Sequence, residues 1–131
     1  MRALLLLLAC VPTVALAGQV EAAVEAPVAY VDAYRTIARQ FEACYRARGI
    51  WGNGFDVLAD LDTTEQVGRV ELFKIGMSGS KPSKVARVVT ITPAGEGTRV
   101  QIAGHSEKYV HITASAISGW LGGSRSCSGR S

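Results

Sequence analysis

The histidines are the residues whose chemistry is most versatile, and the sequence has only two, His105 and His111. They are six residues apart and straddle the predicted boundary between a strand and a helix. A zinc site needs three or four ligands, and no further residue of a metal-ligating type is spaced with this pair. The pattern therefore favours polar residues at or near the surface, without a metal or catalytic role.

A short acidic segment begins like a calcium-binding loop. Asp60 and Asp62 occupy its first and third positions, and Glu71 occupies the twelfth. An EF-hand loop requires glycine at the sixth position for its sharp turn, and this sequence has Glu65 there. The flanking residues also have the alternating pattern of strands instead of helices, so we expect a solvated turn.

Nucleophile and phosphate-binding motifs are absent from the sequence: there is no Gly-x-Ser-x-Gly elbow and no P-loop. We therefore predict that the protein is not an enzyme and holds no cofactor or metal. Five basic residues would favour an acidic partner if they gathered on one surface, but Asp32 and Glu42 lie among them, which favours a mixed solvated face. These five are Arg35, Arg39, Arg46, Lys81 and Lys84.

The first 17 residues have the three parts of a secretory signal peptide. Arg2 is the positive start, residues 3–14 are apolar, and Ala15-Leu16-Ala17 is a small-x-small cleavage site before Gly18. The apolar run is too short for a spanning helix, which takes about 20 residues. An alternative is open, because the residues ending at Cys10 loosely resemble a lipobox, in which that cysteine is acylated and anchors the protein to a membrane.

Three cysteines occur, and Cys10 is either removed with the signal or acylated. The two that are left, Cys44 and Cys127, most simply form one disulfide in an exported chain. Removing Arg2 with the signal leaves 13 basic and 11 acidic residues, a net charge of +2. That balance does not predict nucleic acid as a partner.

Periodicity predicts a single α+β domain over residues 29–131, after a flexible linker over 18–28. Aromatic and aliphatic residues at helical spacing predict a helix over about 29–48, with Cys44 on its apolar face. Alternating patterns then predict a four-stranded antiparallel sheet, and a second helical pattern follows, so that the order is α-β-β-β-β-α with both helices on one face. The predicted strands cover 55–61, 67–77 (with a bulge near Phe73), 85–92 and 98–105, and the second helix covers 108–121.

The large aromatic residues Tyr45, Trp51 and Trp120 lie close in sequence to the two cysteines or to the helix ends. We expect them to fill the core around the disulfide. The segment 78–84, SGSKPSK, is predicted to be an exposed basic loop, which would present Lys81, Pro82 and Lys84 to a partner.

Two segments resemble a group of small proteobacterial envelope lipoproteins of unknown function. They are Phe41-Glu42-Ala43-Cys44-Tyr45, near the end of a helix with an aromatic face, and Trp120-Leu121-Gly122-Gly123-Ser124-Arg125-Ser126-Cys127. Members of the group end in a similar helix followed by a cysteine. The resemblance implies an envelope location and an α+β fold, and it brings no activity. The chain departs from the group in its poor and very early lipobox.

We therefore expect an exported envelope protein, periplasmic or secreted, that acts as a non-enzymatic binding or structural module. Its partner would be an envelope protein that the sequence does not identify. Two alternatives are open. One is a secreted inhibitor or binder of a hydrolase that uses the loop at 78–84. The other is an outer-membrane lipoprotein acylated at Cys10, the only case in which a membrane is a partner.

Overall fold

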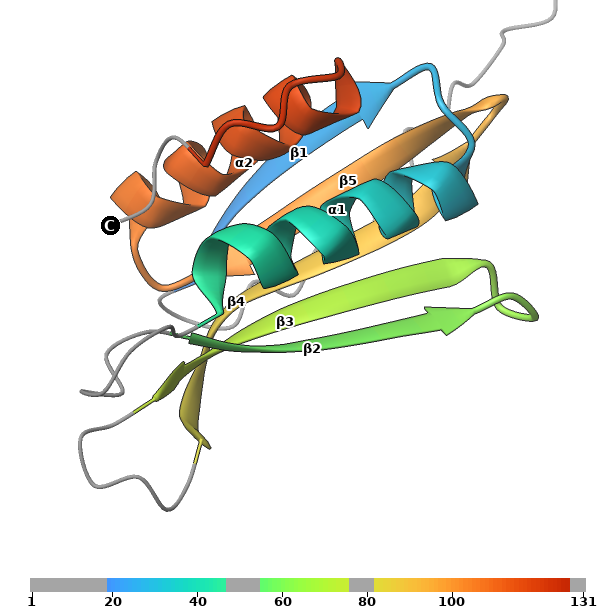
Figure 1. The fold of residues 1–131 in the computed structure, drawn as a ribbon. Helices are drawn as coiled ribbons and strands as arrows, with labels where there is room; N and C mark the ends of the chain where they lie inside the picture. Colours follow the sequence, from blue (N-terminus) through green and yellow to red (C-terminus); the bar gives the residue numbers. More distant parts are fainter. Residues whose placement is uncertain (1–18, 47–54, 76–81, 128–131) are drawn as a thin grey trace, which may run out of the picture.

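A computed structural model describes residues 19–46, 55–75 and 82–127, which form a five-stranded antiparallel sheet and two helices (Figure 1). The α+β class is confirmed. The elements in chain order are β1 (Val20–Ala26), α1 (Tyr30–Tyr45), β2 (Phe55–Asp62), β3 (Val67–Ile75), β4 (Pro82–Ala94), β5 (Gly97–Gly104) and α2 (Glu107–Leu121).

The predicted linker over 18–28 is wrong for most of its length, because residues 20–26 form β1. This strand pairs antiparallel with β5, from Val20 opposite Gly104 to Ala26 opposite Thr98. Its even-numbered residues are half-buried and its odd-numbered residues are exposed, which is the period of a strand with one wet face. Three alanines and two glutamates give the segment weak strand propensity, so its structure depends on a partner strand more than 70 residues away.

The sheet has the order β1-β5-β4-β3-β2, so β2 to β5 form the predicted meander and β1 adds a fifth strand beside β5. A register shift between Leu72 and Phe73 confirms the predicted bulge. The strands around the basic segment differ from the prediction. Because β3 ends at Ile75 and β4 already begins at Pro82, the last three residues of the predicted loop 78–84 are strand.

One face of the sheet carries the core, and both helices lie side by side on that face (Figure 1). Phe41 of α1 meets Trp120 of α2 edge to face, with ring centroids 5.6 Å apart. The opposite face of the sheet carries exposed charged and polar residues such as Asp60, Arg69 and Gln101. The fully buried side chains between the helices and the sheet include Ile37, Phe41, Val70, Val89, Ile91, Val100, Ile102, Val110 and Ile117.

The second helix begins one residue before its predicted start. Ser106 caps it, since its hydroxyl accepts a hydrogen bond from the Tyr109 N–H, and Gly122 ends it. The β-branched run in its first half is compatible with the helix because Thr113 is buried and donates to the Tyr109 carbonyl. The predicted end of the first helix, near residue 48, lies outside the described residues.

Gly97 provides a test of the packing between the start of β5 and the end of β1. A Cβ at this position would lie 2.6 Å from the carbonyl oxygen of Ala26, a backbone atom that cannot rotate away. We expect Gly97→Ala to lower the free energy of unfolding by about 1–3 kcal/mol, measured by urea denaturation.

Gly119→Ala is the matched control, because the nearest atom to its added Cβ is 3.8 Å away. Alanine should stabilise α2 there by about 0.5–1 kcal/mol. Equal effects of the two substitutions would contradict the described packing of Gly97, at the start of β5, against the end of β1.

Candidate functional site

The disulfide joins Cys44 in the last turn of α1 to Cys127, with Cα atoms 5.3 Å apart, which confirms the predicted pairing. After α2 the chain turns back along the helix to reach Cys44 (Figure 1). The Trp120 indole N–H donates to the Ser126 carbonyl at 2.8 Å and holds this return segment. Tyr45 and Trp120 both pack against Phe41 beside the disulfide, as predicted, whereas Trp51 lies outside the described residues.

Reducing this bond should destabilise the fold, because the cysteines are separated by 83 residues and the link removes much freedom from the unfolded chain. We expect reduction, or the double variant Cys44→Ala/Cys127→Ala, to lower the free energy of unfolding by about 2–5 kcal/mol. Guanidinium denaturation, with thiol alkylation and mass spectrometry to verify reduction, measures it. An unchanged midpoint in the fully reduced protein would show that the bond is not a structural one.

Both histidines are exposed, and the structure does not bring them together in one site. His111 lies 3.8 Å from Glu107 one turn away on α2, and His105 follows β5. Within residues 19–46, 55–75 and 82–127, no group of three or more histidine, cysteine, aspartate or glutamate residues is placed to hold a metal ion.

The acidic segment forms the β2–β3 hairpin. Asp62 Oδ1 accepts hydrogen bonds from the backbone N–H groups of Thr64 and Glu65, both at 3.0 Å. Glu71 lies on β3 and pairs with Arg69 at 3.0 Å. The carboxylates are thus used in a turn and in a surface ion pair, which agrees with the solvated turn expected from the sequence.

Of the five basic residues singled out in the sequence, the structure describes the side chains of Arg35, Arg39 and Arg46. Arg46 pairs with Glu42 at 2.6 Å, Arg35 is exposed on α1, and Arg39 lies beside a groove between the helices. Lys81 is outside the described residues. The backbone of Pro82 and Lys84 belongs to β4, opposite Ile75 and Lys74, so these two are not loop residues.

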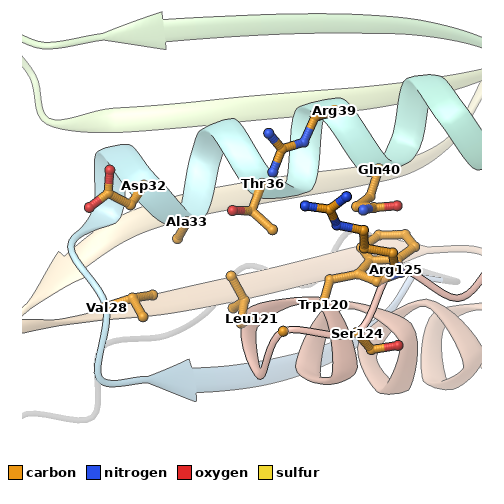
Figure 2. Close-up of a pocket in the computed structure, with 11 residues that line it drawn as sticks. Val28, Asp32, Ala33, Thr36, Arg39, Gln40, Trp120, Leu121, Ser124 and Arg125 are labelled. Atoms are coloured by element: carbon orange, nitrogen blue, oxygen red, sulfur yellow. The ribbon is translucent and has the colours of Figure 1, made fainter.

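The groove between α1 and α2 has a volume of about 270 Å³. Figure 2 shows Arg39 from α1 and Arg125 from the return segment extending over it, with Trp120 below. Both arginines are exposed, and Asp32 lines the same groove. Exposed cations beside a carboxylate are typical of an ordinary solvated surface, so this groove is the weaker candidate.

A cavity of about 440 Å³ at the other end of the helices is the stronger candidate, and we refer to it as the Arg87 cavity. It lies between the start of β4, the end of β5 and the first turn of α2. The residues that line it are Phe55, Lys74, Val85, Ala86, Arg87, His105, Ser106 and Tyr109. Most of its wall is apolar, and none of these residues is acidic.

Arg87 is the one arginine or lysine among the buried residues that the structure describes, with 4% of its surface exposed. Its guanidinium carbon lies 5.2–5.5 Å from the ring centroids of Tyr45, Phe55 and Tyr109, which come from α1, β2 and α2. Nη1 donates to the Thr113 hydroxyl at 2.6 Å. Burial lowers the pKa of Arg87 from its usual value, an effect that Tyr45 and Tyr109 oppose, and an arginine so placed stays charged at neutral pH.

No carboxylate in the described part of the chain forms a salt bridge with Arg87. Nη1 of Arg87 donates to the Thr113 hydroxyl, and the side chain of Tyr45 is a second hydrogen-bond partner, although a guanidinium has five N–H donors. These two partners account for fewer than the five N–H donors of the guanidinium, and Arg87 itself lines the cavity. The arrangement is a fixed cation, walled by aromatic rings, with hydrogen-bond donors to offer.

The sequence analysis did not identify Arg87, although a signal was present. In the run from Val85 to Thr92 the alternation places Arg87 on the same side of the strand as Val89 and Ile91, both of which are fully buried. A charged residue in the inward phase of an otherwise apolar strand is uncommon, because burying a charge is unfavourable. The inward phase of Arg87 is therefore the signal that marks it in the sequence.

Neither helix within the described residues is long and apolar enough to span a membrane. Comparison with models of known protein families found no match, and a search of curated proteins found no relative.

Proposed function

We propose that this is an exported, non-enzymatic binding protein of the bacterial envelope, and that its ligand carries a negative charge which Arg87 binds in the Arg87 cavity. The observation that carries the proposal is a buried guanidinium without a carboxylate partner. Burying an ion without a counter-ion costs several kcal/mol, and a hydrophobic side chain of similar size usually fills such a position at least as well. A ligand that supplies the counter-charge explains why an arginine occupies this position.

The surroundings of Arg87 favour an anion. Among the described residues that line the cavity, Lys74 is a cation exposed at the rim, and none is acidic. Ser106, the N-cap of the 15-residue helix α2, also lines it, so the positive end of the helix dipole lies at the same cavity. The charge of Lys74 and the dipole of α2 each make a modest contribution to the electrostatic potential in the cavity, and both contributions are positive, like that of Arg87.

The polar groups of the cavity support binding in preference to catalysis. The Ser106 hydroxyl already accepts a hydrogen bond from the Tyr109 N–H. His105 is exposed, and none of the described residues that line the cavity beside it carries a carboxylate. A nucleophile with a base in reach, or a carboxylate pair, would have favoured an enzyme.

Export is supported by the disulfide, which is typical of proteins in oxidising compartments. Cleavage between Ala17 and Gly18 would also leave β1 intact, since that strand begins at Val20. Acylation at Cys10 is the alternative and would attach the same domain to a membrane. The resemblance to small envelope lipoproteins is compatible with either location.

Arg87→Met tests the proposed function directly, because methionine fills similar space without charge. We expect the variant to unfold with a free energy within about 1 kcal/mol of the parent protein, since the lost ring contacts are offset by the removed desolvation penalty. We also expect it to lose the binding of acetate and inorganic phosphate, measured by isothermal titration calorimetry and by ligand-induced shifts in melting temperature.

Arg35→Met is the matched control, because Arg35 is exposed on α1 away from the cavity, and it should bind as the parent does. A purely structural arginine gives the opposite pattern. In that case the parent would bind no anion, and Arg87→Met would lose more than about 2 kcal/mol of stability.

The mature N-terminus tests export. We expect mass spectrometry of the protein from a bacterial envelope fraction to find a chain that starts at Gly18, with one disulfide. A chain that starts at an acylated Cys10 would replace the periplasmic location with a membrane-anchored one. A chain that retains Met1 would contradict export.

A further inference from the structure

We infer that the anion bound in the Arg87 cavity is a monocarboxylate carried on an apolar body, such as a short aliphatic or aromatic acid. This inference rests on the proposed function, and it adds the chemical class of the ligand. Three features of the cavity support it: the shape of the donor, the nature of the walls and the number of buried charges.

The donor is a planar fork. A guanidinium presents parallel N–H groups that match the two oxygens of a carboxylate, and such bidentate pairs are among the stronger hydrogen-bonded contacts in proteins. The fork of Arg87 is held in place by Thr113 on one side and by the rings of Tyr45, Phe55 and Tyr109 around it. A donor fixed before the ligand arrives loses little entropy on binding.

The rings themselves are fixed by their neighbours. Tyr45 stacks on Phe41 with centroids 5.1 Å apart and meets Phe55 edge to face at 6.0 Å. Tyr45 is also adjacent to Cys44, which the disulfide anchors. Tyr45 thus belongs to the hydrophobic core, and Phe55, which lines the cavity, packs against that core.

The walls favour a ligand that is apolar beyond its charged end. Phe55, Val85, Ala86 and Tyr109 line most of the cavity, whose 440 Å³ lies within the usual range for small-molecule sites. An apolar body would gain roughly 25 cal/mol for each Å² removed from water against these side chains.

The number of buried charges favours a carboxylate over a phosphate. A phosphate group carries up to two charges and keeps a strong hydration shell, so its sites usually combine several donors. Here the buried donor is one guanidinium, and Lys74 and His105 are exposed at the rim. One buried positive charge is balanced by one carboxylate.

Isothermal titration calorimetry on the purified, disulfide-bonded protein tests the inference with benzoate, hexanoate, benzamide, hexanamide and inorganic phosphate. We expect the two acids to bind with Kd values of about 1 mM or below, which is reasonable for ligands of this size. The neutral amides, which keep the apolar body, should bind at least about tenfold more weakly, because they lose the charge-assisted pair. N-acetylphenylalanine, which resembles the C-terminal residue of a protein chain, is titrated in the same way. Comparing its affinity with that of benzoate distinguishes a chain terminus from a free small acid as the source of the carboxylate.

Arg87→Lys keeps the charge and loses the fork, so we expect it to weaken benzoate binding at least about tenfold. Arg35→Met should leave the affinity unchanged. Phosphate binding as tightly as benzoate would overturn the carboxylate inference and leave the proposed anion site standing. Amides binding as tightly as their acids would overturn both, as would an absence of binding by every anion.

Discussion

The buried charge of Arg87 is the constraint around which one end of this domain is arranged. A guanidinium that has left water needs polarisable or hydrogen-bonding neighbours, and three elements supply those that Arg87 has within the fold. The end of α1 contributes Tyr45, the start of β2 contributes Phe55, and the first turns of α2 contribute Tyr109 and Thr113. α1 and β2 follow each other in the chain, whereas α2 is distant in sequence, and Arg87 contacts both helices at the point where they meet above the sheet.

The disulfide constrains the same end of the domain, because it is attached to α1 next to Tyr45. The chain after α2 returns along that helix, held by the Trp120 contact to the Ser126 carbonyl, and joins α1 one residue before Tyr45. A ring that touches Arg87 is thereby adjacent to a covalent link. In a domain of this size, whose core is limited, such a link contributes a large share of the stability. It also constrains the end of α1, where Tyr45 packs against Arg87.

Local sequence patterns predicted the elements whose signals are local. The aromatic stripe of α1, the strands β2 to β5 and the pairing of the two cysteines follow from spacing and from cysteine count. They could not predict β1, because its alanines and glutamates have little strand propensity and only the distant edge of β5 makes it a strand. Arg87 was missed for a different reason. Its inward phase is visible in the sequence, but the rings around it come from three separate elements, and that coincidence appears only in the fold.

The most direct test of the account is an NMR titration that follows the side-chain Nε–H signal of Arg87, assigned through its loss in Arg87→Lys. A carboxylate bound to the guanidinium fork must change the electronic environment of this group more than that of any other. The account predicts a saturable shift of the Arg87 signal on addition of benzoate, and no such shift with benzamide. Saturation of shifts elsewhere in the protein while the Arg87 signal does not move would contradict it.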